Sequence, residues 1–330
     1  MNPFYRSLEI IWENPRLVFL NEKRAKEVAQ EITKEDLKIP SWRAPVFYQK
    51  DDENFVQLLG VENSINFAFT DFETKRKFKI EFKGQEWTGS FAMAGSLLRA
   101  IEEGISILDA EYLKNIRLKD ILHIFRSIPN YPMPMLKERT EIFREIGRVL
   151  LEKYNGSFWN LFEDAGFRAF GPYGIVHQLR RNFPSFNDVS DYLHFHKRSQ
   201  LLVMVYQGRA LDSNGELPLI GDIDDLGAIA DYEVPKVLEY LGILEYDSHL
   251  KEKILRQEII LKDSPQEQEI RAMTILAMKT LLEEINKLRE GPPAGEAGKI
   301  NMCHLDYRIW KMGKDATNLP PHHLTQTIFY

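Results

Sequence analysis

One stretch, residues 221–247 (GDIDDLGAIADYEVPKVLEYLGILEYD), constrains this chain more than any other. Four aspartates fall within ten residues at its start: Asp222, Asp224, Asp225 and Asp231. Apolar side chains then recur at helical spacing: Val234, Val237, Leu238 and Leu241. Pro235 suits a first helical turn, where its missing N–H costs nothing. The pattern therefore predicts a helix with Asp231 as its N-cap.

Two interpretations of Asp231 stay open on spacing alone. In the first, the aspartate only caps a helix behind an acidic loop, which is the common situation. In the second, the helix N-terminus holds a carboxylate ionised so that it can face a developing cation. Burial would raise the pKa of such an aspartate, and the positive helix end would oppose that rise.

The pattern over the whole chain predicts one mainly α-helical domain, residues 1–330, with a small antiparallel sheet near the N-terminus at about 65–88. The runs INFAF, KFKIEF and QEWTG alternate apolar and polar residues, with Lys83-Gly84-Gln85 as a turn, and predict two or three strands. Helical segments are expected at the following positions: 5–32 with a break near 14–15, 89–103, two or three within 109–154, 157–182 with a break at 171–172, 192–208, and 266–289. The segment 291–298, GPPAGEAG, is the expected short linker.

Two groups of charged residues have plain structural explanations. Lys197 and Arg198 lie in an otherwise apolar segment, where they either extend to solvent or bind a phosphate or carboxylate. Glu267, Glu269 and Arg271 are most simply charges at the head of the long helix, where they complement its dipole.

Composition excludes several classes of protein. The 330 residues carry a net charge of −6, which argues against sequence-independent binding to duplex DNA. Cys303 is the only cysteine, so no internal disulfide is expected and a reducing cytoplasm is the simplest location. The first residues do not resemble a signal peptide, and no apolar run is long enough for a membrane span. No coiled coil is evident, so the sequence predicts no oligomeric state.

Motifs for metal and nucleotide sites are missing. His194 and His196 are two residues apart, which on a helix would point them to different sides, and His322 and His323 are adjacent. No phosphate-binding glycine loop and no nucleophile elbow occur. No metal is therefore expected. Carboxylates remain, and these suit hydrolysis of a glycosidic bond as well as they suit a solvated acidic surface.

The chain resembles the queuosine salvage family, the queuosine 5'-phosphate N-glycosylase/hydrolase proteins, over nearly its whole length. Short pieces carry the resemblance, in a fixed order: NFAF (66–69), RA and EGI (99–105), FRS (125–127), MP and ER (133–139), LLEKYNGSF (150–158), NFPS (182–185), KRSQ (197–200), DI (222–223), ADYEVPKVL (230–238), EIR (269–271), LDYRIW (305–310) and the ending with His323, Ile328 and Tyr330. The resemblance implies a largely helical fold similar to that of DNA glycosylases, hydrolysis of queuosine 5'-monophosphate to queuine and ribose 5-phosphate, and no cofactor.

The same resemblance implies site residues. The catalytic aspartate of the family falls in the ADY motif, hence on Asp231. Queuine carries a cationic secondary amine and a diol, and Asp222 is a candidate acceptor for one of them. The 5'-phosphate needs a cation or several donors, with Lys197 first and His323 and Tyr330 behind it.

A flat base favours aromatic walls. Phe67, Phe91 and Tyr232 are the candidates, with core packing as the more common role for Phe67.

Departures from the family pattern leave alternatives. Positions 90–92, where a Tyr-Trp-Ser run is usual, hold Ser90, Phe91 and Ala92, and further departures are Thr70 and Val205. These changes leave open a preference for the nucleoside over the nucleotide. The alternatives to the salvage enzyme are a non-catalytic binding protein for deazapurine nucleotides and another nucleoside or DNA base glycosylase.

Overall fold

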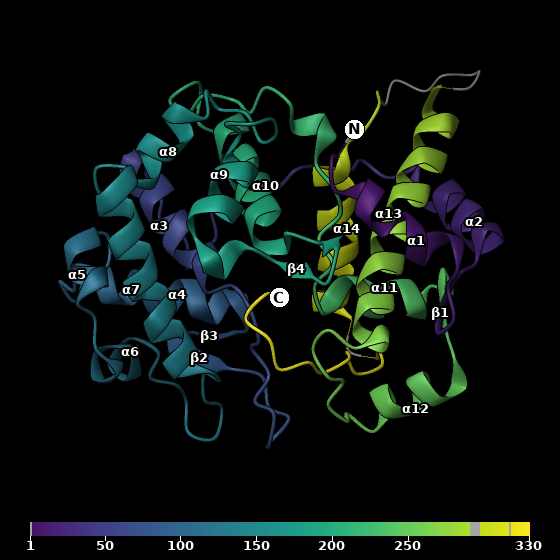
Figure 1. The fold of residues 1–330 in the computed structure, drawn as a ribbon, viewed down its shortest axis with the longest axis horizontal. Coiled ribbons are helices and arrows are strands. Elements are labelled where there is room, and N and C mark those ends of the chain that lie inside the picture. Colours follow the sequence, from purple (N-terminus) through teal and green to yellow (C-terminus); the bar gives the residue numbers. More distant parts are fainter. Residues whose placement is uncertain (1, 291–297, 317) are drawn as a thin grey trace. The chain divides into compact units, whose positions relative to one another are not determined.

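The structure is a computed structural model that describes residues 2–290, 298–316 and 318–330. Fourteen α-helices and three two-stranded antiparallel sheets make up these described residues, which confirms the mainly α-helical prediction (Figure 1). The expected linker lies outside the described residues except for Gly298. The chain forms two compact units. The single domain over residues 1–330 stays a prediction.

The first unit consists of Met1–Pro40, Val189–Lys197 and Ile223–Gln326. Its elements are α1 (Tyr5–Glu13), β1 (Val18–Leu20), α2 (Glu22–Ile32), β4 (Val189–Ser190), β5 (Leu193–His194), the 3₁₀ turn η2 (Ile223–Asp225), α11 (Glu233–Tyr240), β6 (Leu244–Tyr246), α12 (Ser248–Leu255), α13 (Pro265–Glu290) and α14 (Met302–Asp315). Helix α2 packs against α13, and β1 pairs with β6, so the two ends of the sequence share one core (Figure 1).

Helix α14 packs closely on α11 because Gly313 has no side chain. A Cβ at this position would lie 3.0 Å from Cγ2 of Val237 and 3.2 Å from Oε2 of Glu233, tighter than ordinary contact. Small residues let helix backbones approach in this way. The close approach brings the N-terminal half of α14 to the loop that precedes α11.

The second unit consists of Ser41–Asp188, Arg198–Asp222 and Thr327–Tyr330. Its elements are α3 (Glu53–Ser64), β2 (Lys79–Phe82), β3 (Gln85–Thr88), α4 (Ser90–Glu102), α5 (Ala110–Lys114), α6 (Leu118–Ile124), α7 (Leu136–Lys153), α8 (Phe158–Asp164), α9 (Ile175–Asn182), the 3₁₀ turn η1 (Pro184–Phe186) and α10 (Lys197–Leu211), whose first residue belongs to the first unit. The predicted hairpin is β2–β3, with Lys79 opposite Thr88.

Two local predictions are wrong. INFAF is not a strand, and a single bridge from Thr70 to Lys77 is the only pairing described near it. The helix expected over 192–208 begins only at Lys197, because the residues before it form the β4–β5 hairpin. An alternating YLHFH run fits a strand as well as a buried helix, and periodicity cannot separate the two over five residues.

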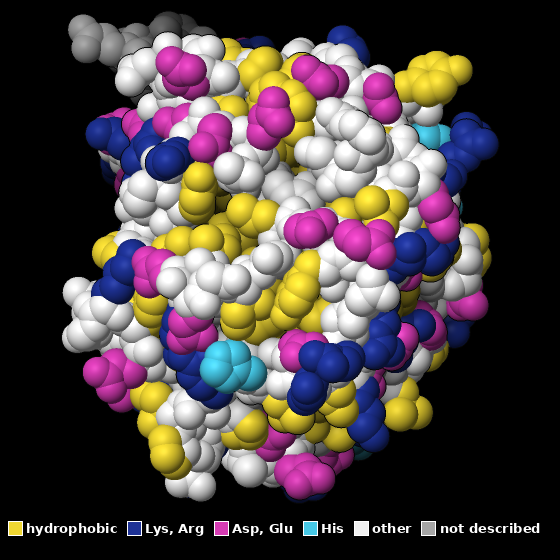
Figure 2. All heavy atoms as spheres, turned by 90° about the vertical axis from the view of Figure 1, so that its left-hand side faces the viewer, with side chains coloured by type: hydrophobic (Ala, Val, Ile, Leu, Met, Phe, Trp, Pro, Cys, Tyr) yellow, Lys and Arg dark blue, Asp and Glu magenta, His cyan; other side chains and the backbone are white. Residues whose placement is uncertain are grey.

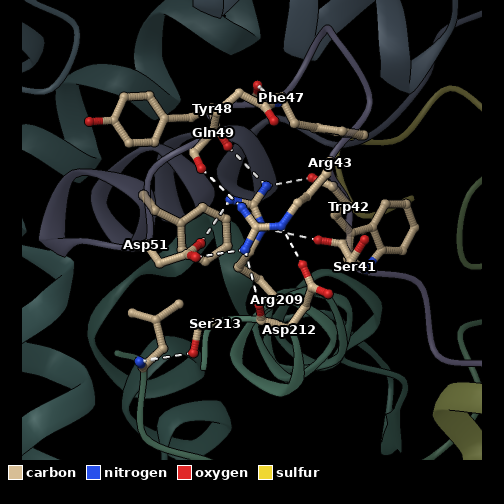
Figure 3. Close-up of polar contacts among 12 residues, drawn as sticks. Ser41, Trp42, Arg43, Phe47, Tyr48, Gln49, Asp51, Arg209, Asp212 and Ser213 are labelled. Atoms are coloured by element: carbon tan, nitrogen blue, oxygen red, sulfur yellow. Dashed lines mark hydrogen bonds and ion pairs between the residues drawn. The ribbon is translucent and has the colours of Figure 1, made fainter. Parts of the chain in front are cut away.

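A buried arginine organises the first segment of the second unit. Arg209 on α10 donates from Nε to the carbonyl oxygen of Ser41 at 2.9 Å and from Nη2 to that of Tyr48 at 2.9 Å (Figure 3). Its Nη1 also lies 3.2 Å from Oδ1 of Asp51, whose other oxygen accepts from Arg43 at 2.6 Å. These backbone carbonyls lie outside helices and strands, and the guanidinium supplies the hydrogen-bond donors that they need.

Charges of both signs are mixed on the surface. Acidic and basic side chains alternate over the face drawn in Figure 2, without a continuous field of lysine and arginine there. None of the helices in the described ranges combines the length and apolar character that crossing a membrane requires.

Glu269, predicted as a charge at the head of the long helix, is buried and anchors the N-terminal segment. Its Oε2 accepts three backbone N–H groups from the segment before β1, those of Arg16, Leu17 and Val18, at 2.9, 2.6 and 3.1 Å. A carboxylate that collects several backbone N–H groups is a strong acceptor. It joins the N-terminal segment to α13.

We expect Glu269→Gln to lower the free energy of unfolding by about 1–3 kcal/mol, because the three N–H groups lose a charged acceptor. The matched control is Glu283→Gln on the same helix. Glu283 is half-exposed and pairs with Lys279 at 2.6 Å, so its loss should cost under about 1 kcal/mol. Urea denaturation of both variants measures the difference, and equal costs would contradict the anchoring role.

Candidate active site

Asp231 lies at the N-terminus of α11, one residue before Tyr232, which holds the N-cap position predicted for Asp231. Its Oδ1 accepts the backbone N–H groups of Glu233 at 2.8 Å and Val234 at 3.0 Å. Both bonds satisfy helix-end donors that have no intrahelical partner, which confirms the capping role. Oδ2 accepts no hydrogen bond from the described residues. One carboxylate oxygen is therefore fixed, and the other is available to a substrate.

A second carboxyl group lies beside this one. Asp306 on α14 is buried, and its Oδ1 accepts the backbone N–H of Ile229 at 2.9 Å. Ile229 is two residues before Asp231, so one short segment carries a contact to each carboxyl group. The segment 226–230 is itself buried, which fixes this arrangement.

Lys197 supplies the positive charge near both carboxyl groups. It is a buried residue at the start of α10. Burial raises the pKa of Asp231 above its ordinary value, and the charge of Lys197 with the N–H bonds from α11 opposes that rise. The cation and the helix end therefore favour the ionised carboxylate in a site where burial alone would neutralise it.

The surroundings of Asp306 favour its protonated form. Burial raises its pKa to about 8; the single bond from Ile229 and the charge of Lys197 oppose the rise, and the negative charge of Asp231 adds to it. Asp231 receives two backbone N–H bonds and Asp306 only one, so the negative charge of the pair resides mainly on Asp231.

Aromatic rings line the chain next to Asp231. The ring of Tyr232 lies with its centroid 4.9 Å from that of His322 and 5.2 Å from that of His323. The phenol of Tyr232 donates to the carbonyl oxygen of Thr325 at 2.7 Å. We call Tyr232, His322 and His323 the ring layer. It joins the start of α11 to the C-terminal segment of the same unit.

His323 is a neutral ring in this layer. Burial lowers the pKa of His323 to about 3, and the positive charges of His322 and Arg271 contribute in the same direction. A histidine with this pKa is not an imidazolium at neutral pH. It can donate or accept one hydrogen bond, but it brings no charge to a phosphate.

Arg271 and Glu267 lie beneath the ring layer, buried on α13. Their side chains are each 2% exposed, and Nη1 of Arg271 is 3.5 Å from Oε1 of Glu267. The pair, predicted as charges at the helix head that complement the helix dipole, is therefore buried, and Glu267 lies in the first turn of α13. The guanidinium carbon lies 4.0 Å from the centroid of the Phe195 ring, two residues before Lys197.

Asp222 and Phe91 belong to the second unit. Their roles as acceptor for the base substituent and as aromatic wall stay predictions. Oδ1 of Asp222 accepts the N–H of Ala169 at 2.6 Å, and Oδ2 that of Phe170 at 3.1 Å. Asp222 therefore already binds backbone within its own unit. Phe91 is half-buried, with its ring centroid 5.3 Å from that of Phe47.

Phe67 and Tyr330, also in the second unit, are both buried. The guanidinium of Arg139 lies 4.2 Å and that of Arg198 5.3 Å from the centroid of the Phe67 ring. This agrees with core packing for Phe67. The backbone carbonyl of Tyr330 accepts the N–H of Ala68 at 3.1 Å, so the C-terminal residue is attached to the body of its unit.

Two predictions about the histidines can be compared with the geometry. His194 and His196 do not lie on a helix, and their rings are adjacent, with Nδ1 of His194 3.2 Å from Nε2 of His196. No group of three or more His, Cys, Asp or Glu side chains within the described ranges could hold a metal ion.

Asp306 and the Glu267–Arg271 pair were not among the predicted site residues, although a signal exists in the sequence. Met302, Leu305, Asp306, Ile309 and Gly313 follow helical spacing, so the aspartate lies on the apolar face of α14. Glu267 and Arg271 are likewise one turn apart among buried residues of α13. A charged residue on an apolar helix face is the pattern to search for.

Comparison with known proteins adds the family of the chain. Residues 46–330 match the family model described as queuosine salvage protein. The chain belongs to the queuosine salvage protein family. The queuosine 5'-phosphate N-glycosylase/hydrolase of Bos taurus is 32% identical and covers 98% of this chain and 97% of its own length. The protein of the same name from Sphaerobacter thermophilus is 33% identical, over 96% of this chain and 94% of its own.

A third member of the queuosine salvage family extends the comparison. The Mus musculus protein with the same name is 32% identical over 84% of this chain and 83% of its own length. Because these alignments run almost end to end, the candidate site lies within the shared region. The likeness to DNA glycosylases implied by the sequence stays a prediction.

Replacing Asp306 by Asn should change how stability depends on pH. With a folded-state pKa near 8 against an ordinary 3.8, this carboxyl group contributes stability below about pH 4 and loses it as pH rises through 8. Asn cannot ionise. The Tm of the variant relative to wild type should therefore increase by at least about 3 °C between pH 5 and pH 8.5. Calorimetry at both pH values measures this, and a constant difference would contradict the assignment.

Proposed function

We propose that this protein is an N-glycosidase that hydrolyses queuosine 5'-monophosphate to queuine and ribose 5-phosphate. Membership of the queuosine salvage family and the names of its near full-length relatives support the reaction class. The observation that carries the proposal is the carboxylate of Asp231, with one oxygen fixed by two backbone N–H groups and the other available.

The chemistry of the base explains why such a carboxylate is needed. Queuine is a 7-deazaguanine, so a carbon replaces the nitrogen at which a purine is usually protonated before it leaves. The bond between C1' and the base nitrogen breaks with its electron pair going to the base. Water adds its oxygen to C1', and its two protons end on the sugar hydroxyl and the base. The ribose carries positive charge in between.

Asp231 stabilises that positive charge. A fixed carboxylate in a partly buried site interacts with an oxocarbenium-like carbon more strongly than water does, and it needs no reorganisation. Lys197 and the N–H groups at the start of α11 favour its ionised form, against the effect of burial. This electrostatic role holds whether the carboxylate attacks C1' or orients a water molecule.

Asp306 is the proposed proton donor to the departing base. With a pKa of about 8 it retains a proton at pH 7 and loses it in alkaline solution. Two neighbouring carboxyl groups with separated pKa values commonly divide the acid and the anionic roles in this way. Base release should therefore slow above about pH 8.

Lys197 has two tasks in this proposal. Its charge favours ionised Asp231, and it remains the first candidate ligand for the 5'-phosphate. His323 joins as a neutral hydrogen-bonding group, since its pKa excludes the imidazolium form at pH 7. Tyr232 is the aromatic wall nearest to Asp231 in the chain.

Further contacts to substrate are proposed from the second unit. Phe91 and Tyr330 are candidates for the base and phosphate, respectively. Asp222 is a candidate acceptor for the queuine amine or diol. Phe67 is the weakest candidate, because two guanidinium groups already cover its ring.

The proposal also includes the setting of the reaction. The substrate is a free nucleotide in the cytoplasm, and no nucleic acid partner is required; the net charge of −6 agrees with this. No metal or organic cofactor takes part in the proposed steps.

The proposal is tested by incubating the pure protein with queuosine 5'-monophosphate and with queuosine, in parallel, with a chelator present. Mass spectrometry follows free queuine at pH 7 and pH 9. We expect rapid release from the nucleotide, and slower release at pH 9. Release from the nucleoside alone would move the specificity to queuosine. Tight binding of both without release would replace the proposal by a non-catalytic binding protein.

Asp231→Asn should lower kcat at least about 100-fold, because the amide cannot stabilise positive charge. Asn still accepts the two N–H bonds of the helix end, so Tm should change by less than about 3 °C. The matched control is Asp247→Asn. Asp247 caps α12 with the same geometry, accepting N–H groups of His249 and Leu250 at 2.9 and 3.3 Å. Equal activity of both variants would rule out Asp231 as the catalytic carboxylate.

A further inference from the structure

The buried pair of Glu267 and Arg271 is not explained by stability alone. The closest contact between its charges, 3.5 Å, is longer than the roughly 2.8 Å of a strong charge-assisted hydrogen bond. Removing two charges from water is costly, and a buried ion pair recovers that cost only when its geometry is excellent. Apolar residues of the same volume often stabilise a core equally well.

The contacts of the guanidinium indicate its role on one side of the site. It lies 4.0 Å from the centroid of the buried Phe195 ring, a cation–π contact in a desolvated position. Phe195 follows β5 and is two residues before Lys197. Fixing this ring fixes the connection from which the lysine projects.

The pair also lies beside the ring layer. The charge of Glu267 raises the pKa of Tyr232, after burial as the larger cause, and the charge of Arg271 opposes it. Arg271 is also among the causes that lower the pKa of His323. The pair is thus close to Tyr232, the residue after Asp231, as well as to the segment of Lys197.

We propose that Glu267 and Arg271 are the positioning pair of the active site: they hold the segment that carries Lys197 and the ring layer that follows Asp231. The inference rests on the proposed function and adds two residues that act through others. Because the two charges are opposite and close together, their fields largely cancel a few ångströms away. The pair therefore acts by placing side chains and not by adding charge at the reacting carbon.

The test is the double variant Arg271→Met with Glu267→Gln. It removes both charges together and keeps the side-chain volumes similar, so neither charge is left buried without its partner. The matched control removes another ion pair of the same unit, with Arg308→Met and Glu35→Gln. That pair is half-exposed, with contacts of 2.5 and 2.8 Å, and it belongs to no part of the proposed site.

We expect the double variant to fold, with kcat at least about 10-fold lower and KM changed less than about 3-fold, because ground-state binding is kept and transition-state stabilisation is lost. In the pH profile of kcat/KM, the rise on the acid side (the acid limb) should move to higher pH, because a displaced Lys197 no longer lowers the pKa of Asp231. The control variant should keep the wild-type kcat and acid limb. A folded double variant with wild-type kcat and acid limb would overturn the inference.

A second measurement is independent of activity. In protein labelled with ¹³C at the aspartate carboxyl carbons, Asp231 is assigned by comparison with Asp231→Asn and titrated by NMR. The inference requires a higher pKa of Asp231 in the double variant than in wild type, and an unchanged pKa would overturn it. If wild type releases no base, the proposed function fails, and this titration still decides the positioning role.

Discussion

The site depends on one interaction, the bonds from the first N–H groups of α11 to Oδ1 of Asp231. A partly buried carboxylate tends to take up a proton, and a site for a developing cation needs it ionised. The helix end supplies two donors and a partial positive charge at the place where the chain enters the helix. The capping oxygen Oδ1 thus orients the carboxylate, and in the proposed reaction Oδ2 faces the substrate.

The neighbouring carboxyl group gains its character from that first one. Asp306 is buried, accepts one backbone N–H group and lies near the charge of Asp231, and burial and that charge raise its pKa to about 8. Gly313 makes this proximity possible, because α14 could not approach α11 so closely with a side chain there. A glycine seven residues after Asp306 thus lets the two helices that carry these carboxyl groups pack closely.

Two residues of α13, Arg271 and Glu269, contact other segments of the same unit. Arg271 contacts the Phe195 ring, and its charge opposes the rise in the pKa of Tyr232, so it lies near the segment before Lys197 and near the residue after Asp231. Glu269, on the same helix, holds the N-terminal segment by three backbone bonds. Helix α13 therefore serves as the base on which the loops of the site are placed, although it carries none of the proposed reacting groups.

The sequence by itself determined the mainly helical class, the β2–β3 hairpin, the family and the cap at Asp231, because periodicity and capping are local and the family pieces keep their order. It did not determine that Glu267 and Arg271 are buried or that Asp306 lies beside Asp231. Those facts depend on which helix faces meet across 75 residues of chain, and local spacing contains no information about such contacts. Only the tertiary structure decided them, and with them the pKa values on which the proposed chemistry depends.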